Sequence, residues 1–224
     1  LGYVDTENYT YGELFNEINA NTGGINCGVE VFDRADSTEE FQAMFSVRGK
    51  ALYTKMDFLF KMIGEILNSS KLEDTKRLYE IVASVKSRAQ VNLTGAGHST
   101  AVLRAAAYSS PMAAFQDEMA GIGYYQFIEK LEKDFEQRKE ETVEELCKLM
   151  KKILRPENFM ISYTGERESL ETVQKLAGAV KAGLGTEPVE KSEEKLTCTK
   201  KNEGFKTSGQ VQYVAQTGNF KKKG

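Results

Sequence analysis

The sequence predicts an α+β protein in which an antiparallel sheet is covered on one face by several helices. Two neighbouring segments early in the chain alternate apolar and polar residues, as strands with one buried face do. Several other segments repeat apolar residues at intervals of three and four, the spacing of amphipathic helices. The composition is that of a globular protein, with 40% hydrophobic and 28% charged residues among 224.

The first predicted elements are a short helix and a pair of strands. Residues 7–20 carry one apolar helical face, and Gly23 and Gly24 end it. Apolar residues then alternate over 25–32 and again over 41–47, with a polar connection between them. Two such runs predict an antiparallel pair with one buried face, and that face needs a cover.

Helices are expected to supply this cover. One is predicted over residues 52–67, and a second follows Ser70 and Glu73, which match a capping box at a helix start. Helical spacing resumes over 99–108 and again over 124–154. Alternation returns at Phe159, Ile161 and Tyr163, which predicts a further strand, and a last helix is expected over 170–184.

The domain organisation follows from a change in composition near the C-terminus. Residues 1–184 are predicted to form one region, and 185–209, rich in lysine, glutamate and threonine, are predicted to be a linker. Alternating apolar residues make 210–224 the expected opening strand of a truncated following repeat. Since the chain begins with Leu1 rather than methionine, we expect a piece of a longer protein.

Charge, hydropathy and cysteine content argue against several classes of protein. The net charge of −3 gives no basic surplus for nucleic acid. No apolar run reaches the roughly 18 to 20 residues of a membrane-spanning helix, so no membrane partner is expected. Three widely spaced cysteines without a C-x-x-C pair favour neither disulfides nor a zinc knuckle, and we expect a reducing, cytoplasmic location.

A single histidine restricts the chemistry that this chain can perform. His98 follows Gly97 and precedes an alanine-rich helical segment, so it could cap a helix, bond a backbone carbonyl or act as a general base. A structural role is the preferred interpretation, because the sequence indicates no nucleophile or carboxylate beside it. One histidine cannot build a two-histidine metal site.

Two arginines and a group of aromatic residues are candidate substrate contacts. Arg88 and Arg104 could bind a substrate carboxylate, although an arginine near a bend between helices more often ties the helices together. The aromatic residues could wall an apolar peptide groove, but core packing is the preferred interpretation. They lie at positions 108, 115, 124, 125 and 127.

Three segments carry a resemblance to a known family. The middle segment spans Arg88 to Glu132; it begins with Arg-Ala-Gln-Val-Asn-Leu-Thr-Gly-Ala-Gly-His and later contains Gly-Ile-Gly-Tyr. The others are Leu1-Gly2 with Thr22-Gly-Gly-Ile25, and Val211-Gln-Tyr-Val214. In this order they resemble the non-catalytic associated region of presequence-protease-like zinc metallopeptidases, in the insulinase and pitrilysin superfamily.

The resemblance implies a fold and a function for the parent protein. Four related α+β repeats would close around a chamber that holds an unfolded peptide, with zinc on an H-x-x-E-H helix in the first repeat. This chain has one histidine and no such motif, so no catalytic or metal residue is assigned to it and the parent's zinc is bound elsewhere. The chain would be an incomplete metallopeptidase-like repeat, inactive alone, that helps to build the chamber wall and to align the peptide.

The expected partners are the remaining domains of the parent peptidase and its peptide substrate. Because missing elements would normally cover part of the sheet, we also expect an exposed apolar patch and a possible homodimer through it. The alternative hypothesis is a stand-alone peptide-binding or assembly module without peptidase activity.

Overall fold

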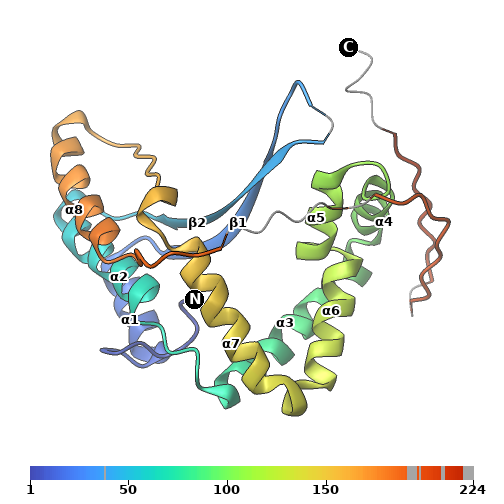
Figure 1. Cartoon of the computed structure of the whole chain (residues 1–224), viewed down its shortest axis with the longest axis horizontal. Helices are drawn as coiled ribbons and strands as arrows, with labels where there is room; N and C mark the ends of the chain where they lie inside the picture. The colour runs from blue at the N-terminus through green and yellow to red at the C-terminus, as the bar shows by residue number, and fades with distance from the viewer. Residues whose placement is uncertain (38, 191–195, 197, 208–209, 219–224) are drawn as a thin grey trace. The chain divides into compact units, whose positions relative to one another are not determined.

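A computed structural model describes residues 1–37, 39–190, 196, 198–207 and 210–218. Strands β1 (Ile25–Asp33) and β2 (Phe41–Gly49) pair as an antiparallel sheet, and the remaining regular structure is helical (Figure 1). The predicted α+β class is therefore confirmed. The chain folds as two compact units; the first comprises Leu1–Val29, Phe45–Leu78 and Lys139–Lys191, and the second comprises Glu30–Met44, Tyr79–Arg138 and Ser192–Gly224.

The first unit is built around α1 (Tyr11–Asn21), α2 (Met56–Asn68) and α8 (Leu170–Ala182), and α2 packs against both other helices. Apolar residues three or four positions apart form its central cluster, which Ile25 and Cys27 of β1 join as partly buried neighbours. The cluster consists of Leu14, Ile18, Met62 and Ile66. Thus α1 and α2 cover the start of β1, as the sequence predicts.

The second unit contains α4 (Gly97–Ala106), α5 (Pro111–Ala120) and α6 (Ile122–Lys133), each packed against the next. Helices α3 (Thr75–Gly95) and α7 (Phe135–Ile153) belong partly to each unit. Phe135 is almost fully buried and its ring lies 5.5 Å from that of Tyr79. Ser110 caps α5 by accepting a hydrogen bond from the Ala113 amide, directly before Pro111 at the first helical position.

The capping box predicted at Ser70 and Glu73 is wrong. The Ser70 hydroxyl donates to the Ile66 carbonyl, which closes the end of α2, and Ser70 pairs with Thr6 in an isolated antiparallel bridge. Helix α3 starts instead after Asp74, whose carboxylate accepts from the Arg77 amide. Ser70 is occupied by contacts with segments distant from the predicted helix start, and a local pattern cannot show this.

Two predicted strands are not formed. Residues 159–163 lie between the short 3-10 helices Pro156–Asn158 and Arg167–Ser169 without strand structure. Residues 210–218 form no strand either, and 219–224 lie outside the described residues. Alternation prepares a segment for pairing, but a strand needs a neighbour for its backbone groups, and the part of the chain that the structure describes provides none. The domain boundaries at 184 and 209 remain predictions.

In the described residues, no helix has both the length and the apolar character needed to cross a bilayer. The third short helix, Tyr53–Lys55, leads directly into α2.

Candidate functional site

The junction between α5 and α6 is built on one buried carboxylate. The Asp117 side chain is only 2% exposed. Its two oxygens accept from the backbone amides of Ile122 and Gly123 at 3.0 and 3.1 Å, the first two amides of α6. A carboxylate there satisfies free donors and faces the positive end of the helix dipole. Asp117 therefore fixes the turn between the two helices.

Gly121 allows this turn because it has no side chain. A Cβ atom at Gly121 would lie 2.2 Å from Asp117 Oδ1 and 2.9 Å from the Asp117 Cα. Its backbone φ of −98° is open to any residue, so the requirement is one of space and not of conformation. The Gly-Ile-Gly sequence at this turn thus accommodates the carboxylate of Asp117.

Arg104 joins α4 to this carboxylate. Its Nη1 atom donates to Asp117 Oδ2 at 2.6 Å, and its side chain is 17% exposed. Because Nη1 is directed at Asp117, the edge of the guanidinium formed by Nε and Nη2 is left for another partner. A guanidinium held in this way is well suited to a second carboxylate, whose two oxygens match the two donors of the free edge.

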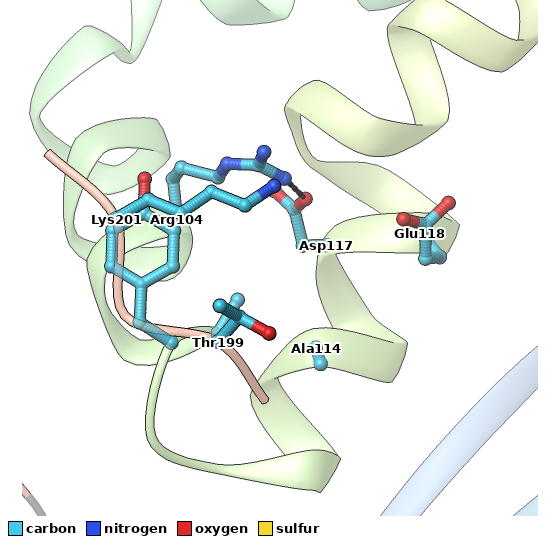
Figure 2. Close-up of a pocket in the computed structure, with 8 residues that line it drawn as sticks. Arg104, Ala114, Asp117, Glu118, Thr199 and Lys201 are labelled. Atoms are coloured by element: carbon cyan, nitrogen blue, oxygen red, sulfur yellow. Dashed lines mark hydrogen bonds and ion pairs between the residues drawn. The ribbon is translucent and has the colours of Figure 1, made fainter. Parts of the chain in front are cut away.

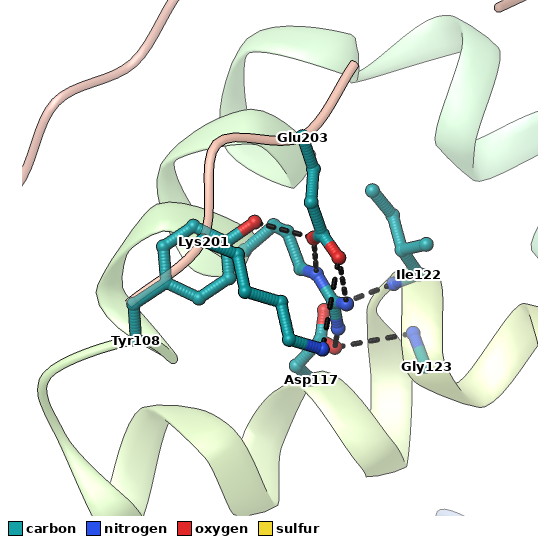
Figure 3. Close-up of polar contacts among 7 residues, drawn as sticks. Tyr108, Asp117, Ile122, Gly123, Lys201 and Glu203 are labelled. Atoms are coloured by element: carbon teal, nitrogen blue, oxygen red, sulfur yellow. Dashed lines mark hydrogen bonds and ion pairs between the residues drawn. The ribbon is translucent and has the colours of Figure 1, made fainter. Parts of the chain in front are cut away.

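Glu203 occupies that free edge (Figure 3). Arg104 Nε donates to Glu203 Oε2 at 2.9 Å, Arg104 Nη2 donates to Oε1 at 3.3 Å, and the Tyr108 hydroxyl donates to Oε2. The Arg104 guanidinium also lies 5.8 Å from the Tyr108 ring centre and 5.7 Å from that of Phe205. We call Arg104, Tyr108, Asp117 and Glu203 the Arg104 cluster.

The charges in the Arg104 cluster shift the pKa of its members. Hydrogen bonds from Arg104 and then Tyr108 lower the pKa of Glu203. The hydrogen bond to Glu203 is also the largest cause that raises the pKa of Arg104. Burial raises the pKa of Tyr108, and the hydrogen bond that it donates to Glu203 raises it further. Near neutral pH the cluster thus contains a charged arginine, an ionised Glu203 and a neutral phenol.

A pocket of about 180 Å³ adjoins the Arg104 cluster (Figure 2). Residues of α4 and α5 form one side, and the segment that carries Glu203 supplies the other. The lining residues are Arg104, Ala107, Tyr108, Ala114, Asp117, Glu118, Thr199 and Lys201. These groups can bind and orient a polar ligand by charge and hydrogen bonding.

The other two predicted site residues do not belong to the Arg104 cluster. His98 is exposed at the start of α4, with its ring centre 6.0 Å from that of Tyr213. Arg88 is exposed on α3, and its charge opposes the burial that raises the pKa of Tyr124. The roles of His98, Arg88 and Arg104 in binding substrate remain predictions.

The aromatic residues proposed for a groove or a core occupy different surroundings. The Phe115 ring lies 5.3 Å from that of Phe41, Tyr108 is in the Arg104 cluster, and Phe127 is half exposed. Tyr125 donates to Glu129, one turn further along α6. No single role covers all five residues.

Asp117 and Glu203 were not identified from the sequence. An aspartate in the last turn of a helix opposes the helix dipole, and with Gly121 and Gly123 just after it Asp117 could have been noticed. Nothing in the sequence around Glu203 marks it, since it is one of several charged residues in a segment without hydrophobic periodicity.

The residues of this chain do not fit the zinc site that the resemblance implies for its parent. The sequence holds one histidine, while an H-x-x-E-H helix binds metal with two. Within the described ranges, no group of three or more histidine, cysteine, aspartate or glutamate side chains is arranged to hold a metal ion.

Comparison with known families decides the relationship of the chain. Residues 1–131 match the family of peptidase-associated regions that accompanies metallopeptidase family 16, subfamily C. The chain belongs to this peptidase-associated family. This confirms the resemblance to the associated region of insulinase-type, presequence-protease-like peptidases.

Relatives of this peptidase-associated chain are much longer proteins. It is 33% identical over all 224 residues to Protein HypA of Clostridium perfringens (strain 13 / Type A), of which it covers 23%. It is 26% identical over 221 residues to Presequence protease 1, chloroplastic/mitochondrial, of Arabidopsis thaliana, matching 97% of this chain and 20% of that protein. It is 29% identical over 138 residues to Presequence protease, mitochondrial, of Yarrowia lipolytica, matching 62% and 14%. The chain thus spans less than a quarter of the length of these relatives.

The cytoplasmic location expected from the sequence is contradicted by these relatives. The proteases from Yarrowia lipolytica and Saccharomyces cerevisiae are named mitochondrial, and the one from Arabidopsis thaliana chloroplastic or mitochondrial. The expectation rested on unpaired cysteines, which indicate a reducing environment but do not distinguish one compartment from another.

Proposed function

We propose that this chain is a non-catalytic region of a presequence-protease-like zinc metallopeptidase that degrades unfolded peptides. In this proposal it forms part of the wall of the peptide chamber and helps to position an extended substrate. The match of residues 1–131 to the peptidase-associated family carries the proposal. The alignment of all 224 residues with Protein HypA supports assigning the whole chain to one such protein.

The proposal divides the labour between this chain and the rest of its parent. With one histidine, the chain leaves the metal and the activated water to other parts of the protein. Its own contribution is to hold the substrate in an extended form, which lowers the entropic cost of reaching the catalytic geometry. The partners are therefore the remaining domains of the parent and the peptide.

Reconstitution tests this proposal. The purified chain is mixed with an unstructured fluorogenic peptide and zinc, alone and together with the remaining portion of its parent protein produced separately. We expect no cleavage by the chain alone and chelator-sensitive cleavage by the mixture, well above that of the remaining portion alone.

Three results would contradict the proposal. Chelator-sensitive cleavage by the chain alone would assign it a catalytic site. A parent protein without an H-x-x-E-H sequence, or a remaining portion that is fully active without this chain, would instead favour a stand-alone binding or assembly module.

A further inference from the structure

The segment that carries Glu203 is attached to the second unit mainly through side chains. Its described residues, 198–207, form neither helix nor strand, and every residue from Thr199 to Thr207 is exposed. Little apolar surface is therefore buried to hold it in place. The Glu203 carboxylate is the exception, because Arg104 and Tyr108 contact it through three hydrogen bonds.

The side that receives Glu203 is fixed independently of the segment. Asp117 is held by the Ile122 and Gly123 amides, and it directs the Arg104 guanidinium through Nη1. Tyr108 lies one turn after Arg104, just beyond the end of α4. A receptor whose donors are already oriented binds a carboxylate with a smaller entropic cost than flexible side chains do.

We propose that Arg104 and Tyr108 form a receptor for a carboxylate in an extended acidic peptide, and that Glu203 occupies it as an internal ligand. The aromatic ring of Phe205, two residues after Glu203, covers the guanidinium and extends the recognition to a glutamate followed at the second position by an aromatic residue. This inference concerns groups within the second unit only and does not rest on the proposed peptidase function.

The structure also indicates that the internal ligand is exchangeable. Local contacts with few buried apolar groups open at low cost, so the segment can leave while α4 and α5 remain folded. Lys201, with Nζ 3.8 Å from Glu203 Oε1, travels with the segment and does not belong to the receptor. An external peptide must therefore compete with a tethered ligand at high effective concentration.

A binding experiment in trans tests the proposal. A fluorescent peptide with the sequence of residues 199–207, blocked at both ends, is titrated into the full chain and into the Glu203→Ala variant. We expect the peptide to bind the variant and to bind the unmodified chain at least about tenfold more weakly, because the tethered carboxylate competes. The same peptide with glutamine in place of its glutamate should bind the variant at least about tenfold more weakly than the original.

Two receptor variants in the Glu203→Ala background separate binding from folding. Arg104→Lys keeps a positive charge beside Asp117 but loses the two-donor edge, so peptide affinity should fall at least about tenfold. Arg88→Gln removes an exposed arginine of α3 outside the Arg104 cluster and should leave affinity unchanged. Circular dichroism checks that both variants keep their helical content.

A peptide of unrelated sequence with the same glutamate-to-aromatic spacing tests the class of ligand, and it should also bind the Glu203→Ala variant. The proposal is overturned if the folded variant binds no peptide at millimolar concentration, or if peptides with glutamate and glutamine bind equally. Equal affinity for the unmodified chain and the variant, or failure of the unrelated acidic peptide, would also overturn it.

Discussion

At the scale of single residues, Asp117 combines near-complete burial with three hydrogen bonds from charged and backbone donors. A buried carboxylate of this kind is stable only while each partner remains, because an unpaired buried charge or donor is costly. Its replacement therefore has a larger effect than that of an exposed glutamate with an equally short ion pair.

We expect Asp117→Asn to lower the free energy of unfolding by about 2–3 kcal/mol, measured by urea denaturation. Asparagine has one acceptor oxygen for two backbone amides and no charge for Arg104. The matched control is Glu144→Gln, which removes an exposed partner of Lys148 and should leave the urea midpoint unchanged. Equal midpoints for the unmodified chain and Asp117→Asn would contradict this account of the junction.

A second residue-scale prediction concerns the titration of Glu203. Its pKa is lower in the folded chain than the roughly 4.3 of a free glutamate, so its ionised form stabilises the contact above that pH. This stabilisation is lost as the pH falls through the lowered pKa. Carbon-13 NMR of the glutamate carboxyls should show a Glu203 midpoint below about 4.3.

Tyr108→Phe should raise this midpoint, because it removes one of the hydrogen bonds that favour the ionised form. Tyr125→Phe, which removes a hydroxyl that donates to Glu129, should not change it. A Glu203 midpoint that is the same in the unmodified chain and in Tyr108→Phe would show that the hydroxyl does not contact the carboxylate in solution.

At the scale of elements, glycines within or beside helices have opposite roles according to the space around them. Gly121 lies against Asp117, whereas a Cβ atom at Gly64, inside α2, would meet no atom within 4 Å. A helix interior favours alanine over glycine by about 0.5–1 kcal/mol because glycine loses more backbone freedom on folding. The sign of the effect of a glycine-to-alanine change should therefore differ between the two positions.

We expect Gly64→Ala to raise the thermal midpoint and Gly121→Ala to lower it, measured by circular dichroism. The added methyl group at Gly121 must displace the Asp117 carboxylate or the backbone that carries it. A Gly121→Ala chain with an unchanged midpoint would mean that the turn between α5 and α6 adapts without using the Asp117 contacts.

At the scale of the whole molecule, large apolar side chains remain exposed among the described residues. Val29 continues the strand face of Ile25 and Cys27 that packs against α1 and α2, yet it is 44% exposed. Leu52 and Met160 are exposed at 75% and 70%. Surfaces of this kind favour association when no other part of a protein covers them.

We therefore expect the isolated chain to dimerise as its concentration rises, measured by sedimentation velocity. Val29→Lys places a charge on the exposed part of the strand face and should shift the equilibrium toward monomer. Glu144→Gln serves again as the neutral control. Sedimentation as a monomer throughout the concentration range would contradict the expected homodimer.

The sequence by itself determined the elements whose apolar residues repeat with a clear period, and it identified the family. Helices α1, α2 and α8 and strands β1 and β2 lie where that spacing predicts them, because one buried face imposes a regular pattern on local sequence. The same reasoning identified Arg104 as a candidate, but it could not separate Arg104 from Arg88 and His98. All three are polar residues on neighbouring helical segments without a visible partner.

Only the tertiary structure decided which partners meet. Glu203 lies 99 residues after Arg104, so no local pattern connects them, and Asp117 is recognisable as a buried anchor only once the start of α6 faces it. The segment 159–163 shows the same limit in reverse, since its alternation is genuine but no strand in the described residues pairs with it. Periodicity reports which face of a segment is apolar, whereas pairing depends on contacts between distant positions, and these exist only in the folded chain.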